Sequence, residues 1–252
     1  MKELFTMWRN TRMVVLTAIC AAVYVAVLLP FKIATIVPGF TEFRPGAAMP
    51  VLLALLFGPA GAWGAGFGNL IGDLLGGMFG PGSIPGFLGN FLYGFVAYKL
   101  WRALRGDRPA RPTSALHWVV LQGILIVSAV TCGFVIGWGV DLLGLVPFAV
   151  LATAITVNNA VACLILVNVL IALVEPRIEK WRLLYTDILD AGSISRGRLR
   201  GVGAALVVAA PVAGLALGLV LSVAHGKAVG SLSIGAGLAP LVGVLLAGCL
   251  LL

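Results

Sequence analysis

The chain alternates between long apolar runs and short polar segments. Only helices and closed barrels satisfy their own backbone groups in hydrocarbon, and the period-two alternation of barrel strands is absent. The pattern therefore predicts an all-α integral membrane protein whose uncharged runs form eight transmembrane helices. They lie near residues 13–30, 47–57, 60–78, 84–101, 115–138, 147–174, 201–224 and 232–252.

The second run, residues 47–57, is short for a bilayer because a helix rises about 1.5 Å per residue and this one would extend roughly 16 Å. Gly58-Pro59 ends it. We expect a partial span that the preceding loop extends.

Basic residues fix the predicted orientation. With the N-terminus in the cytoplasm and eight alternating spans, 14 of the 17 Lys and Arg residues lie inside, in segments of three, five and six. Cytoplasmic loops carry such an excess of basic residues. Only Lys32, Arg44 and Lys227 would then lie outside. We therefore expect a multi-pass protein of the cell (inner) membrane, in contact with lipid.

Composition excludes several other classes. The chain is 61% hydrophobic and 10% charged, far from a soluble domain. Its net charge of +8 comes from short segments between apolar runs, which predicts no nucleic-acid face. The four cysteines lack metal-type or paired spacing, so we expect no disulfide, metal site or cofactor. No GxxxxGK[ST] loop occurs, so the chain does not power itself with ATP.

Polar side chains within the spans form the candidate site. Each requires a partner or a cavity at that depth. Six of them fall in the outer half or near the middle of the membrane: Asn69, Asp73, Asn90, Tyr93, Asn158 and Asn159. We predict that they line one pocket open to the outside. The alternative is that Asn69, Asp73 and Asn90 form hydrogen bonds between helices, worth about 1 kcal/mol or less each.

The first outer loop, near residues 31–46, is long enough to be a lid over that pocket. It holds Glu42 and Arg44, which would otherwise form a weak surface pair. Trp138 and Asp141 at the outer end of the fifth span are weaker candidates.

Two further patterns concern organisation. The polar stretch 175–200 begins with apolar residues at helical spacing, which predicts an amphipathic helix on the cytoplasmic surface. We expect a six-helix domain over 1–180, a basic connector over 181–200 and two additional transmembrane helices over 201–252. In the first span Ala18, Ala22 and Ala26 form a stripe that lets another helix pack closely.

The order of these features resembles a known family. An alanine stripe, a lid-like loop and six spans with an outer polar pocket are similar to the substrate-binding S components of energy-coupling factor (ECF) vitamin transporters. The stretches EFRPGAAMPVLLALLFGPAGAWGAGFGNLIGDLLGG and GSIPGFLGNFLYGFVAYKLW resemble S components grouped with the riboflavin-type members. The resemblance covers residues 1 to about 180, and the last two spans lie beyond it.

The resemblance implies a six-helix protein that captures a vitamin-like small molecule outside. Its partners would be a transmembrane coupling subunit, which the three alanines would face, and two ATPase subunits. Ligand contacts would fall on the first loop and later spans, which correspond to Glu42, Phe43, Arg44, Asn90, Tyr93 and Asn158. A flavin, a thiamine-like heterocycle, a modified purine precursor and a tetrapyrrole remain open as ligands.

Two other functions compete with this one. A self-sufficient secondary transporter would need a coupling carboxylate, and Asp73 is the one acidic residue clearly inside a span. A membrane enzyme is disfavoured because His117 and His225 have no catalytic companion at motif spacing. We expect a substrate-binding importer subunit and no enzyme activity.

Overall fold

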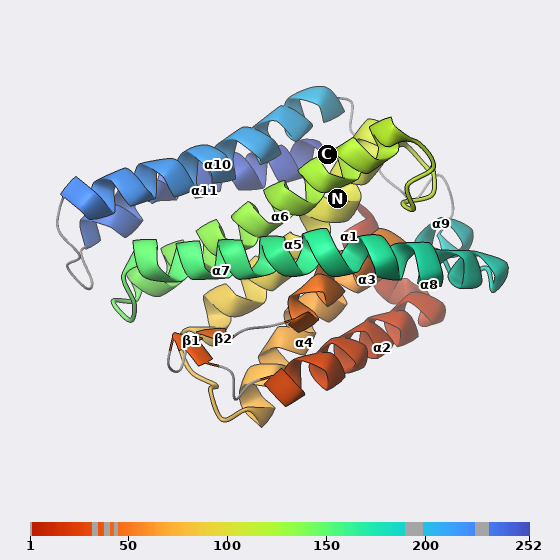
Figure 1. The fold of residues 1–252 in the computed structure, drawn as a ribbon, viewed down its shortest axis with the longest axis horizontal. Helices are drawn as coiled ribbons and strands as arrows, with labels where there is room; N and C mark the ends of the chain where they lie inside the picture. The colour runs from red at the N-terminus through yellow and green to blue at the C-terminus, as the bar shows by residue number, and fades with distance from the viewer. Residues whose placement is uncertain (1, 32–34, 38–40, 43–44, 190–198, 225–231) are drawn as a thin grey trace.

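The computed structural model describes residues 2–31, 35–37, 41–42, 45–189, 199–224 and 232–252. It is an all-α membrane protein with one small hairpin of strands (Figure 1). The longer helices are α2 (Thr11–Leu28), α3 (Met49–Phe57), α4 (Pro59–Leu75), α5 (Ser83–Arg105), α6 (Ala115–Leu142), α7 (Phe148–Ala162), α8 (Asn168–Lys180), α10 (Arg200–Ala224) and α11 (Leu232–Leu251). The shorter elements are α1 (Lys2–Thr6), η1 (Met7–Arg9), η2 (Leu29–Phe31), β1 (Thr35–Val37), β2 (Thr41–Glu42), η3 (Pro45–Ala48), η4 (Cys163–Val167) and α9 (Tyr185–Ile188).

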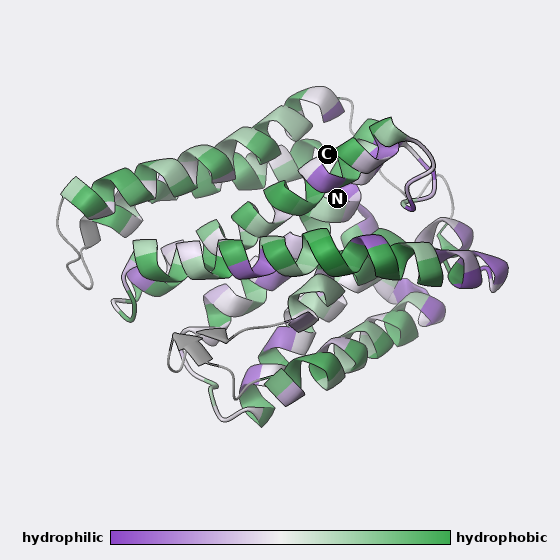
Figure 2. Ribbon diagram, in the orientation of Figure 1, coloured by the Kyte–Doolittle hydropathy of each residue, from purple (hydrophilic) through white to green (hydrophobic). Residues whose placement is uncertain are grey.

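Hydropathy along the helices agrees with a bilayer protein. Among the described residues, five helical segments are long and apolar enough to cross a membrane: Thr11–Phe31, Ala115–Leu142, Phe148–Ile188, Arg200–Ala224 and Ile234–Leu251. Figure 2 shows apolar residues along the helices and polar ones mainly toward their ends. We call the end with α1, α8 and α9 the basic end, and the other the hairpin end.

The short second helix forms as the sequence predicts. All nine residues of α3 are buried, so it lies inside the bundle rather than against lipid. At Gly58 the backbone has φ +55°, a conformation that L side chains rarely adopt, and α4 begins directly after it. Gly61 then packs directly against the backbone of α3. The chain therefore reverses at this point.

The last predicted span of the six-helix part is longer than expected. Helix α7 continues through the π-helical turn η4 into α8, which ends at Lys180. The amphipathic helix expected from residue 175 onward is thus mainly the end of α8, followed by the four-residue α9. Residues 190–198 lie outside the described part.

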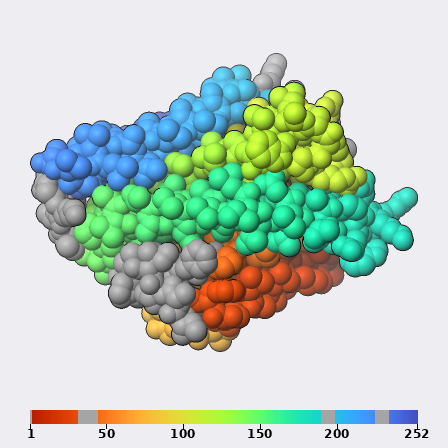
Figure 3. All heavy atoms as spheres, viewed as in Figure 1, coloured from red at the N-terminus to blue at the C-terminus, as the bar shows by residue number. Residues whose placement is uncertain are grey.

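The C-terminal helices α10 and α11 pack against each other and against α6. Figure 1 shows this pair on one side of the bundle and α2 on the opposite side, with α7 between them, and Figure 3 shows the same order for α10, α7 and α2. The two additional helices therefore leave the outward surface of α2 uncovered.

Candidate functional site

One cavity of about 200 Å³ lies in the hairpin-end half of the bundle. Five helices wall it, and the loop between α4 and α5 borders it. The lining residues are Tyr24, Asn69, Asp73, Met78, Gly80, Pro81, Gly82, Ser83, Gly86, Asn90, Cys132, Ile136, Val140, Leu145, Leu151, Ile155 and Asn159. Four of the six polar residues predicted for a pocket, from α4, α5 and α7, therefore meet at a single hollow.

Asp73 is the formally charged residue among those that line the cavity. Its Oδ2 accepts hydrogen bonds from Asn69 Nδ2 at 3.2 Å and from Ser83 Oγ at 3.0 Å. Ser83 begins α5, where the helix dipole favours a negative charge. Gly86 allows this approach, since a Cβ there would lie 2.9 Å from Asn69 Nδ2. The carboxylate is thus held in place while it borders the cavity.

Asn90 continues the polar lining on α5. Its Oδ1 accepts from the Tyr24 hydroxyl of α2 at 3.1 Å, and its Nδ2 donates to the Gly86 carbonyl at 2.9 Å. Each side-chain amide carries two N–H donors, so Asn69 and Asn90 each retain a second N–H besides these bonds.

Tyr93 and Asn158 differ from the expectation. Tyr93 does not line the cavity; its hydroxyl donates to the Asn159 carbonyl at 3.3 Å and lies 2.8 Å from Cys163 Sγ. It braces α5 against the π-helical turn next to the cavity. Asn158 is buried on α7 but is not a lining residue, because neighbouring helical positions point about 100° apart and Asn159 takes the cavity side.

The other wall is aliphatic and comes from α6 and α7. It comprises Ile136, Val140, Leu151 and Ile155. Among the lining residues only Tyr24 is aromatic, so the cavity offers a ligand few rings on which to stack. The aromatic rings of Trp63, Phe67, Phe87 and Phe91 instead form their own cluster on α4 and α5.

The predicted lid is described only in part. Strands β1 and β2 form an antiparallel pair that contacts α7. Glu42 belongs to β2, whereas Phe43 and Arg44 lie outside the described residues. Trp138 and Asp141 have structural roles: Trp138 Nε1 donates to the Gly235 carbonyl at 3.0 Å, and Asp141 Oδ1 accepts from the Phe148 amide at 2.9 Å.

The alanine stripe lines a second hollow, an apolar groove on the outside of the bundle. Ala18, Ala22 and Ala26 of α2 are exposed there. Trp8, Phe67 and Ile71 complete its sides. We call this surface the α2 groove; its small residues leave room for an incoming helix.

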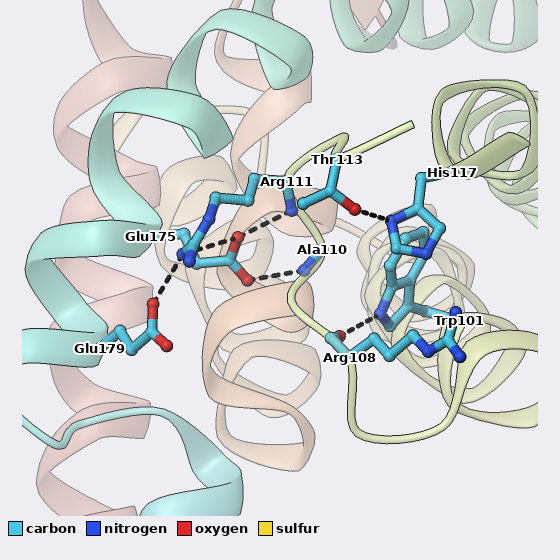
Figure 4. Close-up of polar contacts among 8 residues, drawn as sticks. All are labelled: Trp101, Arg108, Ala110, Arg111, Thr113, His117, Glu175 and Glu179. Atoms are coloured by element: carbon cyan, nitrogen blue, oxygen red, sulfur yellow. Dashed lines mark hydrogen bonds and ion pairs between the residues drawn. The ribbon is translucent and has the colours of Figure 1, made fainter. Parts of the chain in front are cut away.

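A cluster at the basic end anchors the loop between α5 and α6 (Figure 4). Glu175 of α8 is 3% exposed and accepts from the backbone amides of Ala110 and Arg111, at 2.7 Å each. Arg111 also pairs with Glu179 at 2.7 Å. None of these residues lines the cavity beside Asp73, and their contacts fasten the loop to α8.

His117 belongs to the same region. Its Nδ1 lies 2.6 Å from Thr113 Oγ1, and its ring packs edge-on against Trp101, with centroids 6.0 Å apart (Figure 4). These contacts give it a packing role. His225 lies outside the described residues.

Tyr24, Ser83 and the aliphatic wall were missed in the sequence. A single tyrosine in an apolar run, and a serine two positions after a proline, carry no pattern that distinguishes them from ordinary helix residues. Ser83 is not on the same helix as Asp73, so helical spacing could not place the two together. The loop between α4 and α5 turns the chain and returns Ser83 to the side of Asp73. Only the packing of α2 and α5 beside α4 places both at the cavity.

Comparison with known proteins identifies a family. Neither a curated protein nor a solved structure matches the chain. The model of the QueT transporter family matches residues 14–176, which run from the first turn of α2 into α8 and include every residue that lines the cavity. This is a family of ECF S components; the match does not extend to the riboflavin-type grouping. The chain therefore belongs to the QueT transporter family.

Proposed function

We propose that this protein is the substrate-binding subunit of an ATP-driven importer, and that its ligand is a queuosine precursor held in the cavity beside Asp73. The observation that supports the proposal is the set of polar groups on one cavity, opposite an aliphatic wall: the Asp73 carboxylate with the amide that donates to it, and the Asn90 amide with the tyrosine that donates to it. Membership of the family supports the same class of ligand.

The chemistry of such a ligand matches the lining. Queuosine precursors are substituted 7-deazaguanine bases, whose ring N–H and exocyclic amine form two parallel donors. The bonds from Asn69 and Ser83 both fall on Asp73 Oδ2, so Oδ1 would accept from one of these donors. The remaining N–H groups of Asn69 and Asn90 would face the carbonyl and ring nitrogen. The aliphatic residues Ile136 and Ile155 would cover the flat faces of the base.

Size supports a small heterocycle. Drug-sized ligands occupy pockets of about 300–1,000 Å³. The cavity of about 200 Å³ suits a bicyclic base better than a flavin or a tetrapyrrole.

The proposed orientation places the basic end in the cytoplasm and the N-terminus with it, because basic residues gather there. The cavity then lies in the outer half of the cell membrane. Energy would come from two ATPase subunits through a transmembrane coupling subunit docked on the α2 groove. In this arrangement residues 1–180 form the binding domain, and 201–252 are an addition to it. The segment 31–46 would be the lid, with Glu42, Phe43 and Arg44 as ligand contacts.

The direct test is binding by the purified full chain. Protein prepared without added ligand is analysed by mass spectrometry for a bound base, then titrated with 7-aminomethyl-7-deazaguanine, guanine and adenine. We expect the deazaguanine to bind most tightly and Asp73→Asn to weaken it at least about tenfold. Asp107→Asn, an exposed carboxylate at the basic end, is the control. Equal binding by Asp73→Asn, or no binding by the wild type, contradicts the proposal.

The secondary-transporter alternative gives a different result. If Asp73 coupled uptake to protons, proteoliposomes containing this chain alone would take up the base in response to a pH gradient, and Asp73→Asn would abolish that response. For a binding subunit, uptake depends on added coupling and ATPase subunits and on ATP.

A further inference from the structure

Helix α10 contacts both of the helices, α6 and α7, that form the aliphatic wall of the cavity. Its buried positions make one stripe: Gly203, Val207, Ala210, Pro211, Gly214, Gly218 and Ser222. A Cβ on Gly214 would overlap the ring of Phe134 from α6, and one on Gly218 would overlap the ring of Phe148 from α7. Each glycine therefore leaves the space that one aromatic ring occupies, and we call these two spaces the Gly214 and Gly218 sockets.

One of those rings lies behind the wall and the other lies beside it. Phe134 is between the cavity-lining residues Cys132 and Ile136 in sequence and, two positions from each, points away from them. Phe148 begins α7 one turn before Leu151 and two turns before Ile155, on the face of that helix that lines the cavity. The two rings contact each other edge-on with centroids 6.4 Å apart. One aromatic pair thus connects α10 to both helices of the wall.

The connection is stiff at each contact. Helices α6 and α7 approach closely at Gly137, where an added Cβ would lie only 2.6 Å from the Cβ of Ala152. Nearer the start of α10, the same stripe is held by α11, whose Gly248 lies against Val207. Trp138 of α6 also donates to the Gly235 carbonyl of α11. Protein interiors are close-packed, so a displacement at one of these contacts is passed on to the next.

We infer that the α10–α11 pair presets the aliphatic wall of the ligand cavity, with Gly214 and Gly218 as positioning residues that act through Phe134 and Phe148. This inference rests on the proposed function. The pair lies on the opposite side of the bundle from the α2 groove (Figure 3), so it does not occupy the surface proposed for the coupling subunit. Its role concerns how long the ligand is retained.

The test is a double-mutant cycle on the full-length protein, with dissociation of 7-aminomethyl-7-deazaguanine as the readout. Gly218→Ala overfills the socket and Phe148→Leu empties it, so each single variant should release the base about tenfold faster. The double variant Gly218→Ala/Phe148→Leu should return toward the wild-type rate, because the smaller side chain makes room for the added methyl. Gly243→Ala on α11, which has nothing within 4 Å, is the matched control and should not change the rate.

The outcomes separate the two proposals. If the wild type does not bind the base, the proposed function fails and this inference falls with it. If the wild type binds but Gly218→Ala and Phe148→Leu both release the base at the rate of Gly243→Ala, only the inference is overturned. Should Gly218→Ala not yield monodisperse protein, Phe148→Leu and Gly214→Ala decide the question by the same comparison. Loss of retention in both single variants without rescue in the double variant also counts against it, because it indicates general loosening.

Discussion

Ser83 donates a hydrogen bond from its hydroxyl to Asp73 Oδ2 at 3.0 Å, and so connects the start of α5 to the end of α4 at the edge of the cavity. The two residues are ten positions apart, on either side of a loop rich in glycine and proline. The bond orients the carboxylate that we propose to recognise the ligand.

Removing that bond should weaken ligand binding without unfolding the protein. We expect Ser83→Ala to reduce affinity about fivefold, since a typical hydrogen bond contributes about 1 kcal/mol. Ser128→Ala is the matched control, because Ser128 is equally buried but does not line the cavity. Titration of both purified variants with the deazaguanine checks this, and equal affinities would argue against a role for Ser83.

The Tyr24 hydroxyl should matter in the same way. Tyr24→Phe removes the donor to Asn90 Oδ1 and frees that amide to rotate, so we expect a loss of affinity of about 1 kcal/mol. Tyr98→Phe is the control: Tyr98 is as fully buried as Tyr24 but lies outside the cavity. If the two variants bind alike, Asn90 is held by other contacts.

A large side chain in the α2 groove should lower transport without changing ligand binding. In Ala22→Trp the large side chain fills the groove, so ATP-dependent uptake should fall at least about tenfold while ligand affinity stays at the wild-type value. Ala216→Trp places the same side chain at an exposed position of α10 on the other side of the bundle. Uptake is measured in proteoliposomes with the coupling and ATPase subunits, and equal uptake by both variants rules out docking on this groove.

Glu175 should be important for stability. Glu175→Ala leaves the backbone amides of Ala110 and Arg111 buried without their acceptor, and we expect a loss of about 2–3 kcal/mol. The neighbouring Glu179, 47% exposed, should contribute less than about 1 kcal/mol when changed to alanine. Thermal unfolding in detergent compares the two, and a smaller effect for Glu175 would contradict the assignment.

Stability should also depend on pH through Glu3. Burial alone would raise the pKa of this carboxyl, but its ion pair with Lys99 of α5 outweighs burial and holds the pKa below its ordinary value. A carboxyl with a lowered pKa stabilises the fold at pH values above its ordinary range, and this stabilisation is lost as the pH falls through the lowered value.

Wild type should therefore be more stable than Glu3→Gln by about 3 kcal/mol at pH 7, because the variant leaves Lys99 buried without its partner. The difference should shrink below about pH 4. Unfolding temperatures across that range test this, with Glu179→Gln as the control. A gap that stays constant with pH would mean that ionisation of Glu3 does not stabilise the fold.

The sequence alone determines where the helices form and where they break. A bilayer core offers backbone groups no water, so an uncharged run has to form a helix, and the predicted span near 84–101 is α5, Ser83–Arg105. The break at Gly58-Pro59 is equally local, because the positive φ at Gly58 and the missing amide of Pro59 act on the backbone directly. Helical spacing likewise places Asn69 and Asp73, four positions apart, on one face of α4.

Contacts between distant segments were decided only by the tertiary structure. Their positions in the span indicated that Asn158 and Asn159 lie at the same depth in the membrane. The rotation of α7 against α6 brings only Asn159 to the cavity. The same packing recruits Tyr24 from α2 and sets the Gly218 socket against Phe148. Depth follows from the order of residues along one helix, whereas the direction a side chain faces depends on how neighbouring helices pack, and that is a property of the whole bundle.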